Sequence, residues 1–177
     1  MKKNECVVFG FFDLVYLLTA CLLARLLSTL LLRFANVLVP VSYHAGAILN
    51  VVTITVVSLA LVGVLTFHDG YRYASFDPVV SLISAGAASL IHFGLGLATR
   101  FAPILFGPTR DLAGLISYGS FYNSPARVEQ ISFGSLAVVG IIAMLVYVGV
   151  MLLMNWLGCR KRLRDRAITT GADGASI

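Results

Sequence analysis

The chain has 177 residues, of which 59% are hydrophobic and 12% are charged, and its formal net charge is +5. Soluble domains carry about 45–50% apolar and about 25% charged residues, so this chain has too few charged side chains to cover a surface exposed to water. Its length corresponds to about one domain, and its composition excludes an ordinary soluble domain and predicts an integral membrane protein.

The first predicted membrane span covers residues 7–27, an apolar stretch that Asp13 and Arg25 interrupt. Four polar residues recur on one helix face, namely Arg25, Thr29, Arg33 and Asn36. Either the helix continues past the bilayer and lies along its surface until Pro40 ends it, or a long tilted helix turns this stripe toward the other helices. We favour a position of Arg25 near the membrane boundary, because its side chain then reaches water at low energetic cost.

Three further stretches predict membrane-spanning helices over residues 46–67, 78–99 and 131–157. Each is free of Asp, Glu, Lys and Arg and reaches the ~20 residues needed to cross about 30 Å of hydrocarbon. Their apolar runs are continuous rather than alternating, which favours helices over barrel strands. The expected fold class is therefore all-α, a bundle of four transmembrane helices within residues 1–160.

The connection between the second and third spans, residues 68–77, is expected to form a turn whose aromatic side chains suit the membrane interface. Asp77 followed by Pro78 is a favourable helix start, because an aspartate caps the first backbone N–H groups and a proline fits the first turn.

Residues 100–130 form one long predicted loop before the last helix. In an alternative with five spans, residues 101–121 cross the membrane and bury Arg110 and Asp111 at mid-depth, which is costly, so we favour four spans. The same region offers three candidates for contacts with lipid headgroups: Arg100, Arg110 and Arg127.

Residues 161–177 are predicted to form a basic, partly disordered cytosolic tail. Five Lys and Arg residues fall between Arg160 and Arg166. A compact basic run beside a span marks the cytosolic side of a membrane, and no extended basic surface remains elsewhere to bind nucleic acid. We therefore expect both termini in the cytosol, and we expect the membrane to be a bacterial inner (plasma) membrane.

His92 is the one ionisable side chain expected deep within the three uninterrupted spans. Ionisable groups inside a membrane are candidates for proton or solute pathways. Asn50 and Thr53 share a face of the second span and are predicted to line such a path with His92. The alternative is structural, with a neutral histidine and the second-span side chains bonded across helix interfaces.

Small residues on the third and fourth spans predict close helix packing. On the third span, Ser81, Ala85 and Ala88 share a face with His92. On the fourth span, the small residues are Gly140 and Ala143.

No catalytic motif is recognisable, and the three cysteines are widely separated and form no metal-ligand pattern. We expect no catalytic residue, no metal and no cofactor. The favoured function is a subunit or accessory factor of a membrane complex, with the lipid bilayer and other membrane proteins or further copies of the chain as partners. A small solute or ion transporter or channel component is the alternative, and a membrane-bound enzyme is the least favoured.

Reporter fusions after residues 40, 72, 115 and 165 test this topology. With four spans and cytosolic termini, fusions after 72 and 165 give cytosolic fluorescence, and fusions after 40 and 115 give external alkaline phosphatase activity. Fluorescence after 40 together with phosphatase activity after 72 would contradict four spans and support five.

Overall fold

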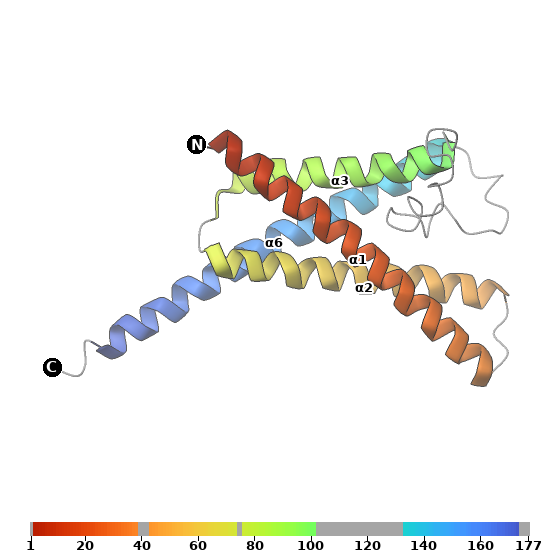
Figure 1. The fold of residues 1–177 in the computed structure, drawn as a ribbon, viewed down its shortest axis with the longest axis horizontal. Helices are drawn as coiled ribbons and strands as arrows, with labels where there is room; N and C mark the ends of the chain where they lie inside the picture. Colours follow the sequence, from red (N-terminus) through yellow and green to blue (C-terminus); the bar gives the residue numbers. More distant parts are fainter. Residues whose placement is uncertain (1, 39–42, 74–75, 102–132, 174–177) are drawn as a thin grey trace.

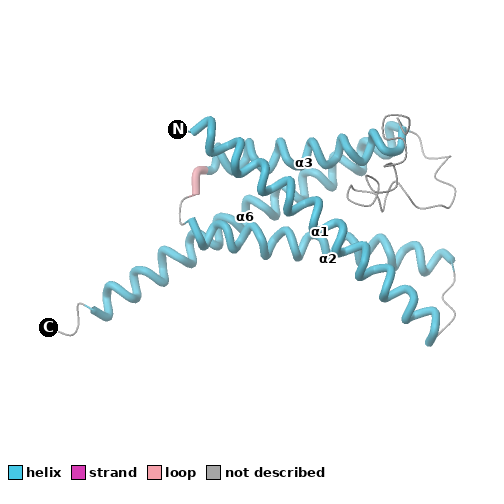
Figure 2. The backbone as a smooth tube through the Cα atoms, in the orientation of Figure 1, coloured by secondary structure: helices cyan, strands magenta, loops and turns pink. Residues whose placement is uncertain are grey.

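The computed structural model describes residues 2–38, 43–73, 76–101 and 133–173. Within these ranges every regular element is a helix (Figure 2). They are α1 (Lys2–Leu38), α2 (Tyr43–Tyr73), α3 (Pro78–Phe101) and α6 (Phe133–Asp173). The stretches long and apolar enough to cross a membrane are Cys6–Leu38, Ile48–Tyr73, Pro78–Ala98 and Val138–Thr169. The prediction of an all-α fold with four transmembrane helices is confirmed, and the chain is a multi-pass membrane protein.

Three helices extend beyond their predicted ends. α1 continues without a break to Leu38, and only Arg25 of its polar stripe is half-buried, so the stripe does not face the other helices. The expected turn over residues 68–77 is wrong in its first part, because α2 continues to Tyr73. α6 runs through the basic segment to Asp173. Hydropathy locates the apolar part of a helix, whereas polar residues that form helices well carry the backbone hydrogen bonds further.

Most of the expected loop over residues 100–130 lies outside the described residues. The same holds for the fifth span of the alternative topology, residues 101–121, of which only the first position is described.

The four helices form an up-down-up-down bundle (Figure 1). α1 and α3 run in one direction and α2 and α6 in the other, so the N-terminal end of α1 and the C-terminal end of α6 lie at the same end of the bundle. Each helix packs on two neighbours, in the ring order α1, α2, α6 and α3. α1 crosses its neighbours obliquely, and its last turns run away from the bundle.

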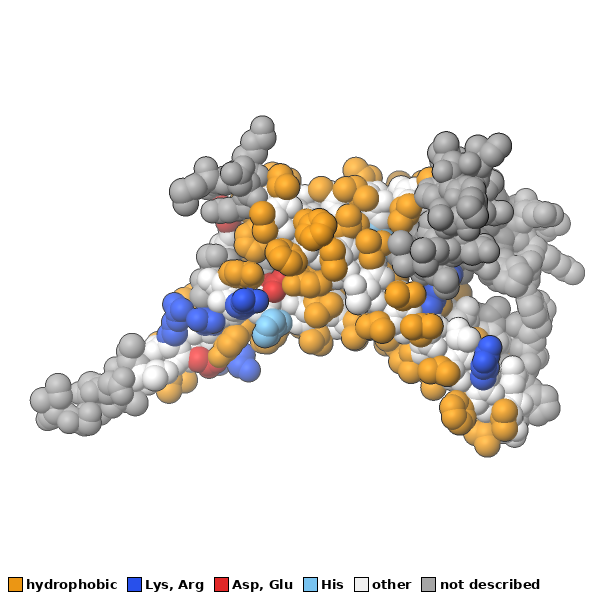
Figure 3. Space-filling model, viewed as in Figure 1, with side chains coloured by type: hydrophobic (Ala, Val, Ile, Leu, Met, Phe, Trp, Pro, Cys, Tyr) orange, Lys and Arg blue, Asp and Glu red, His pale blue; other side chains and the backbone are white. Residues whose placement is uncertain are grey.

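Hydrophobic side chains cover the outside of the bundle, and Lys and Arg side chains gather toward its ends (Figure 3). Val56, Leu90 and Leu145 are each more than half exposed. Such a surface suits contact with lipid rather than water. The inside is lined largely by small residues, and Ala20 and Ala24 of α1 are fully buried. Small side chains let the helices approach closely where no hydrophobic effect drives them together.

The C-terminal end of α2 is tied to α6 by polar and aromatic contacts. Arg162 Nη1 donates hydrogen bonds to the carbonyl oxygens of Tyr71 and Arg72, both at 3.0 Å. These carbonyls belong to the last turn of α2, where the backbone has no partner within the helix. Tyr71 in turn donates to Asp165 at 3.2 Å, and the Arg160 guanidinium lies 5.2 Å from the centre of the Trp156 ring. This mixture of aromatic and basic groups is typical of a membrane interface.

Two glycines allow the backbones of α2 and α6 to touch. A Cβ atom at Gly158 would overlap the Phe67 carbonyl oxygen and would lie 2.8 Å from the Tyr71 nitrogen. A Cβ atom at Gly70 would overlap the carbonyl oxygen of Asn155. Because both obstructions are backbone atoms, no side-chain rotation relieves them, and the two helices must separate to accept any larger residue.

Replacing Gly158 with Ala should lower the free energy of unfolding by about 1–3 kcal/mol, because the added methyl group overpacks this crossing. Gly149 is the matched control, since it lies on the same helix and an added Cβ would have no neighbour within 4 Å. Gly149→Ala should leave stability unchanged or raise it by up to about 1 kcal/mol through helix propensity. Unfolding in a detergent titration measures both variants, and equal stabilities would contradict the close approach.

Candidate functional site

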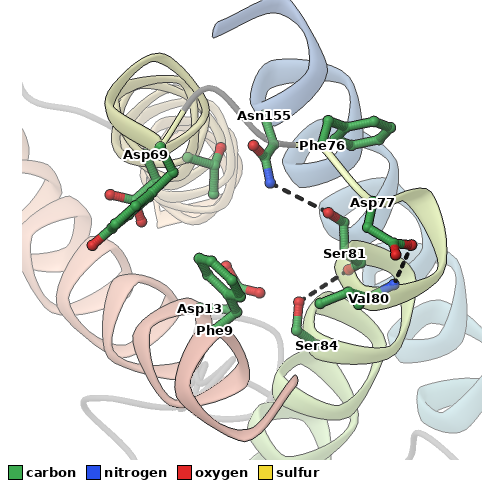
Figure 4. Close-up of a pocket in the computed structure, with 11 residues that line it drawn as sticks. Phe9, Asp13, Asp69, Phe76, Asp77, Val80, Ser81, Ser84 and Asn155 are labelled. Carbon is green, nitrogen blue, oxygen red and sulfur yellow. Dashed lines mark hydrogen bonds between the residues drawn. The ribbon is translucent and has the colours of Figure 1, made fainter. Parts of the chain in front are cut away.

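A pocket of about 500 Å³ opens at the end of the bundle where the chain's described ends lie (Figure 4). It is bounded by the first half of α1, the last turns of α2, the start of α3 and the middle of α6. Each helix contributes at least one polar side chain to its lining. We call it the acidic pocket, because three carboxylates line it: Asp13, Asp69 and Asp77.

The three carboxylates are held by different local contacts. Asp13 points from α1 toward Ser84 of α3 (Figure 4). Asp69 of α2 accepts a 2.7 Å hydrogen bond from the Tyr16 hydroxyl of α1. These two contacts fix α1 against both α3 and α2 at the pocket.

Asp77 caps the N-terminus of α3, as the sequence predicted. Its Oδ1 atom accepts hydrogen bonds from the backbone nitrogens of Val79 at 3.0 Å and Val80 at 3.3 Å. The backbone N–H groups at a helix start carry partial positive charge, so this carboxylate is partly compensated. The prediction of the helix start at Asp77 and Pro78 is confirmed.

The charge in the pocket is one-sided. The chain has eight Asp and Glu residues, and three of them line this single pocket. No Lys, Arg or His is among its lining residues. Within the described part of the chain, no three His, Cys, Asp or Glu residues are grouped closely enough to ligate one metal ion. The carboxylates therefore surround a space rather than converge on a point.

The neutral polar groups in the lining direct most of their hydroxyl protons into the protein. Thr66 donates to the Val62 carbonyl at 2.8 Å, and Ser84 donates to the Ser81 carbonyl at 3.1 Å. Ser81 Oγ accepts a long 3.5 Å bond from Asn155 Nδ2. A hydroxyl that donates to backbone still offers its oxygen lone pairs as acceptors. The pocket consequently presents mainly acceptors, which suit a ligand rich in donors.

Aromatic rings lie among the acidic residues of the pocket (Figure 4). Phe9 and Tyr73 meet edge to face with their ring centres 5.7 Å apart, and Phe76 lies nearby in the lining. Aromatic faces attract cations through the ring quadrupole. The Arg72 guanidinium lies 5.6 Å from the centre of the Tyr73 ring, so one cation already lies beside these aromatic side chains. Carboxylates and aromatic faces both favour a positively charged ligand.

A smaller adjoining cavity has Ala85, Met151 and Leu152 in its wall, together with Asp13 and Asn155 of the acidic pocket. Met151 is only 2% exposed and belongs to the hydrophobic core.

None of the side chains predicted to line a transport path lies in this pocket. His92 is fully buried in α3, Asn50 accepts a 2.6 Å hydrogen bond from Ser28 of α1, and Thr53 is half-buried in α2. The Ser28–Asn50 bond joins α1 to α2, as expected if Asn50 has a structural role in bonding across a helix interface.

The residues predicted to pack helices are mostly inside the bundle. Ala85 and Ala88 are buried, and Ala143 is half-buried against the core. Gly140 lies directly against the Phe93 ring, where a Cβ atom would overlap it. Ser81 has a different place, since it lines the acidic pocket.

Among the proposed lipid contacts, Arg100 lies in α3 with its side chain outside the described part, and Arg110 and Arg127 lie outside the described residues.

The sequence alone does not predict the pocket, because its three acidic residues lie in separate segments of the chain. In the sequence, Asp13 interrupts the first span, and an ionisable residue inside a membrane segment is a functional candidate. Asp69 was placed in a turn, but the continuation of α2 sets it on the same helix face as Thr66 and Tyr73. Asn155, at the end of an otherwise apolar run, was the remaining available signal.

Comparison of the chain with protein-family models, with curated proteins and with solved structures finds no match.

Proposed function

We propose that this multi-pass membrane protein binds a small organic cation, an amine or quaternary ammonium ion, as the recognition component of a solute transport system. The observation that supports this proposal is the acidic pocket, which is lined by three acidic residues with no basic side chain among the lining residues. Its volume of about 500 Å³ falls within the range of about 300–1,000 Å³ that is typical of small-molecule sites.

The electrostatics of the pocket favour a positively charged occupant. Asp13 lies close enough to Asp69 for the two carboxylates to repel each other. Like charges sharing a partly dehydrated site raise its free energy unless a proton or a cation offsets them. An ammonium group supplies both the missing charge and the hydrogen-bond donors that the acceptors of the lining lack.

The position of the pocket gives the proposed direction of access. It lies at the same end of the bundle as the junction of α2 with the basic part of α6. If the basic segment is cytosolic, as its charge predicts, the pocket opens toward the cytosol. The proposed location remains a bacterial inner membrane. His92, Asn50 and Thr53 remain candidates for the interior of a transport path.

Ethanolamine and tetramethylammonium are suitable probes of the pocket. Each should raise the melting temperature of the detergent-purified protein, because a ligand that binds only the folded state stabilises it. Asp69→Asn and Asp13→Asn should each weaken binding at least about tenfold, which corresponds to about 1.4 kcal/mol. Asp165→Asn is the matched control, since this carboxylate bonds Tyr71 and lies outside the pocket. If neither probe stabilises the wild-type protein, or if Asp69→Asn binds as well as Asp165→Asn, the proposed function is wrong.

A role as a subunit of a larger membrane complex is the second candidate. The last turns of α1 run away from the bundle (Figure 1), and Phe34, Val37 and Leu38 are at least 69% exposed there. An isolated helix end of this kind offers an apolar surface to a neighbouring membrane protein or a second copy of the chain.

Under this second hypothesis, protein extracted in mild detergent should co-purify with a stoichiometric partner or as a homo-oligomer. Substituting Phe34 and Val37 with Ala should shift it to the monomer by removing the exposed apolar surface. Mass measurement of the detergent-stripped complex checks the composition. A stable wild-type monomer that retains probe binding would count against the subunit role and leave cation recognition in place.

A further inference from the structure

One face of α6 connects the acidic pocket with the centre of the bundle. Asn155, Met151 and Tyr147 follow each other at intervals of four residues, so they lie one above another on the same side of the helix. Asn155 lines the pocket, whereas Met151 and Tyr147 are buried in the core. From Asn155 to Tyr147 is about 12 Å along the helix axis.

A second group of polar side chains lies beyond Met151. The Tyr147 hydroxyl is hydrogen-bonded to the Ser58 hydroxyl of α2 and to the Cys21 thiol of α1. All three residues are at most 4% exposed. We call this group the polar layer. It brings together three helices inside a bundle whose other contacts are mainly apolar, and buried polar groups are costly unless they are bonded.

Ser89 is a further buried polar group inside the bundle. It is fully buried, and its Oγ atom has no hydrogen-bond partner in the described part of the chain. It lies about 7.5 Å further along α3 than Ser84, which lines the acidic pocket. A buried hydroxyl without a protein partner is usually satisfied by an internal water molecule.

Met151 is the side chain that separates the two polar regions. It lines the small cavity below the acidic pocket and lies one helical turn from Tyr147. Methionine is unbranched and has three rotatable side-chain bonds, so it changes conformation more readily than a β-branched residue of similar size.

We infer that Met151 is a movable floor of the acidic pocket, and that its displacement admits water and small solutes to the polar layer of Cys21, Ser58 and Tyr147. The inference rests on the proposed function only for the identity of the solute that the carboxylates attract. Arg25 lies one turn beyond Cys21 on α1, and its positive charge opposes the passage of a cation beyond the layer.

The native Cys21 thiol provides the test. In the full chain with Cys6→Ser and Cys159→Ala, Cys21 is the one remaining thiol. Purified protein is treated with methanethiosulfonates that carry either a trimethylammonium group or a sulfonate group, and the modification of Cys21 is followed by mass spectrometry. Met151→Ala should accelerate modification by about tenfold or more, a factor equivalent to lowering the opening free energy by about 1.4 kcal/mol.

Leu153→Ala is the matched control, because it removes an apolar side chain of α6 that is 53% exposed and lies outside both cavities. It should leave the modification rate unchanged. In the Met151→Ala protein the cationic reagent should react faster relative to the anionic one, and adding Asp69→Asn should reduce that preference, because the reagent enters past the pocket carboxylates.

Three results would overturn the inference: a wild-type Cys21 that already reacts at the Met151→Ala rate, equal rates in the Met151→Ala and Leu153→Ala proteins, or a charge preference that Asp69→Asn leaves unaltered. The proposed function is judged separately by the ammonium probes. If the probes do not bind but Met151→Ala still exposes Cys21, cation recognition fails and the movable floor stands. If the probes bind but Cys21 stays protected in the Met151→Ala protein, cation recognition stands and the movable floor fails.

Discussion

The contact between the backbones of α2 and α6 is the constraint on which the other features depend. Gly70 and Gly158 allow it, and every larger side chain at either position prevents it. The contact sets Asn155 of α6 beside the last turns of α2, next to Asp69, so the polar wall of the pocket forms only when the two helices touch. It also brings Arg162 within reach of the last α2 carbonyls, so the backbone at that helix end is satisfied.

The bundle places its polar groups according to depth. Apolar residues face outward along the helices, where lipid is the expected solvent, and small residues fill the contacts between them. Carboxylates are grouped at one end and separated from the central hydroxyl groups by Met151. Three acidic residues line this one space, and no Lys, Arg or His is among its lining residues.

The sequence predicted those features that depend on local chemistry. The apolar spans follow from composition, and the start of α3 follows from an aspartate placed before a proline. The pocket could not be predicted in the same way. Asp13 and Asp69 are far apart in the chain, and they meet because α1 crosses the bundle obliquely and α2 continues one turn past its apolar segment. His92 is fully buried in α3 and does not line the pocket.

The continuity of α6 has a mechanical consequence. This one helix of 41 residues, about 60 Å long, carries Tyr147, Met151 and Asn155 in its inner half and the basic cluster in its outer half. A helix transmits bending and rotation along its axis because its hydrogen bonds form an uninterrupted ladder. Close to the junction of the two halves, Arg162 donates two hydrogen bonds to backbone carbonyls in the last turn of α2. The basic outer half of α6 is therefore continuous with the helix segment that carries Asn155 of the pocket wall.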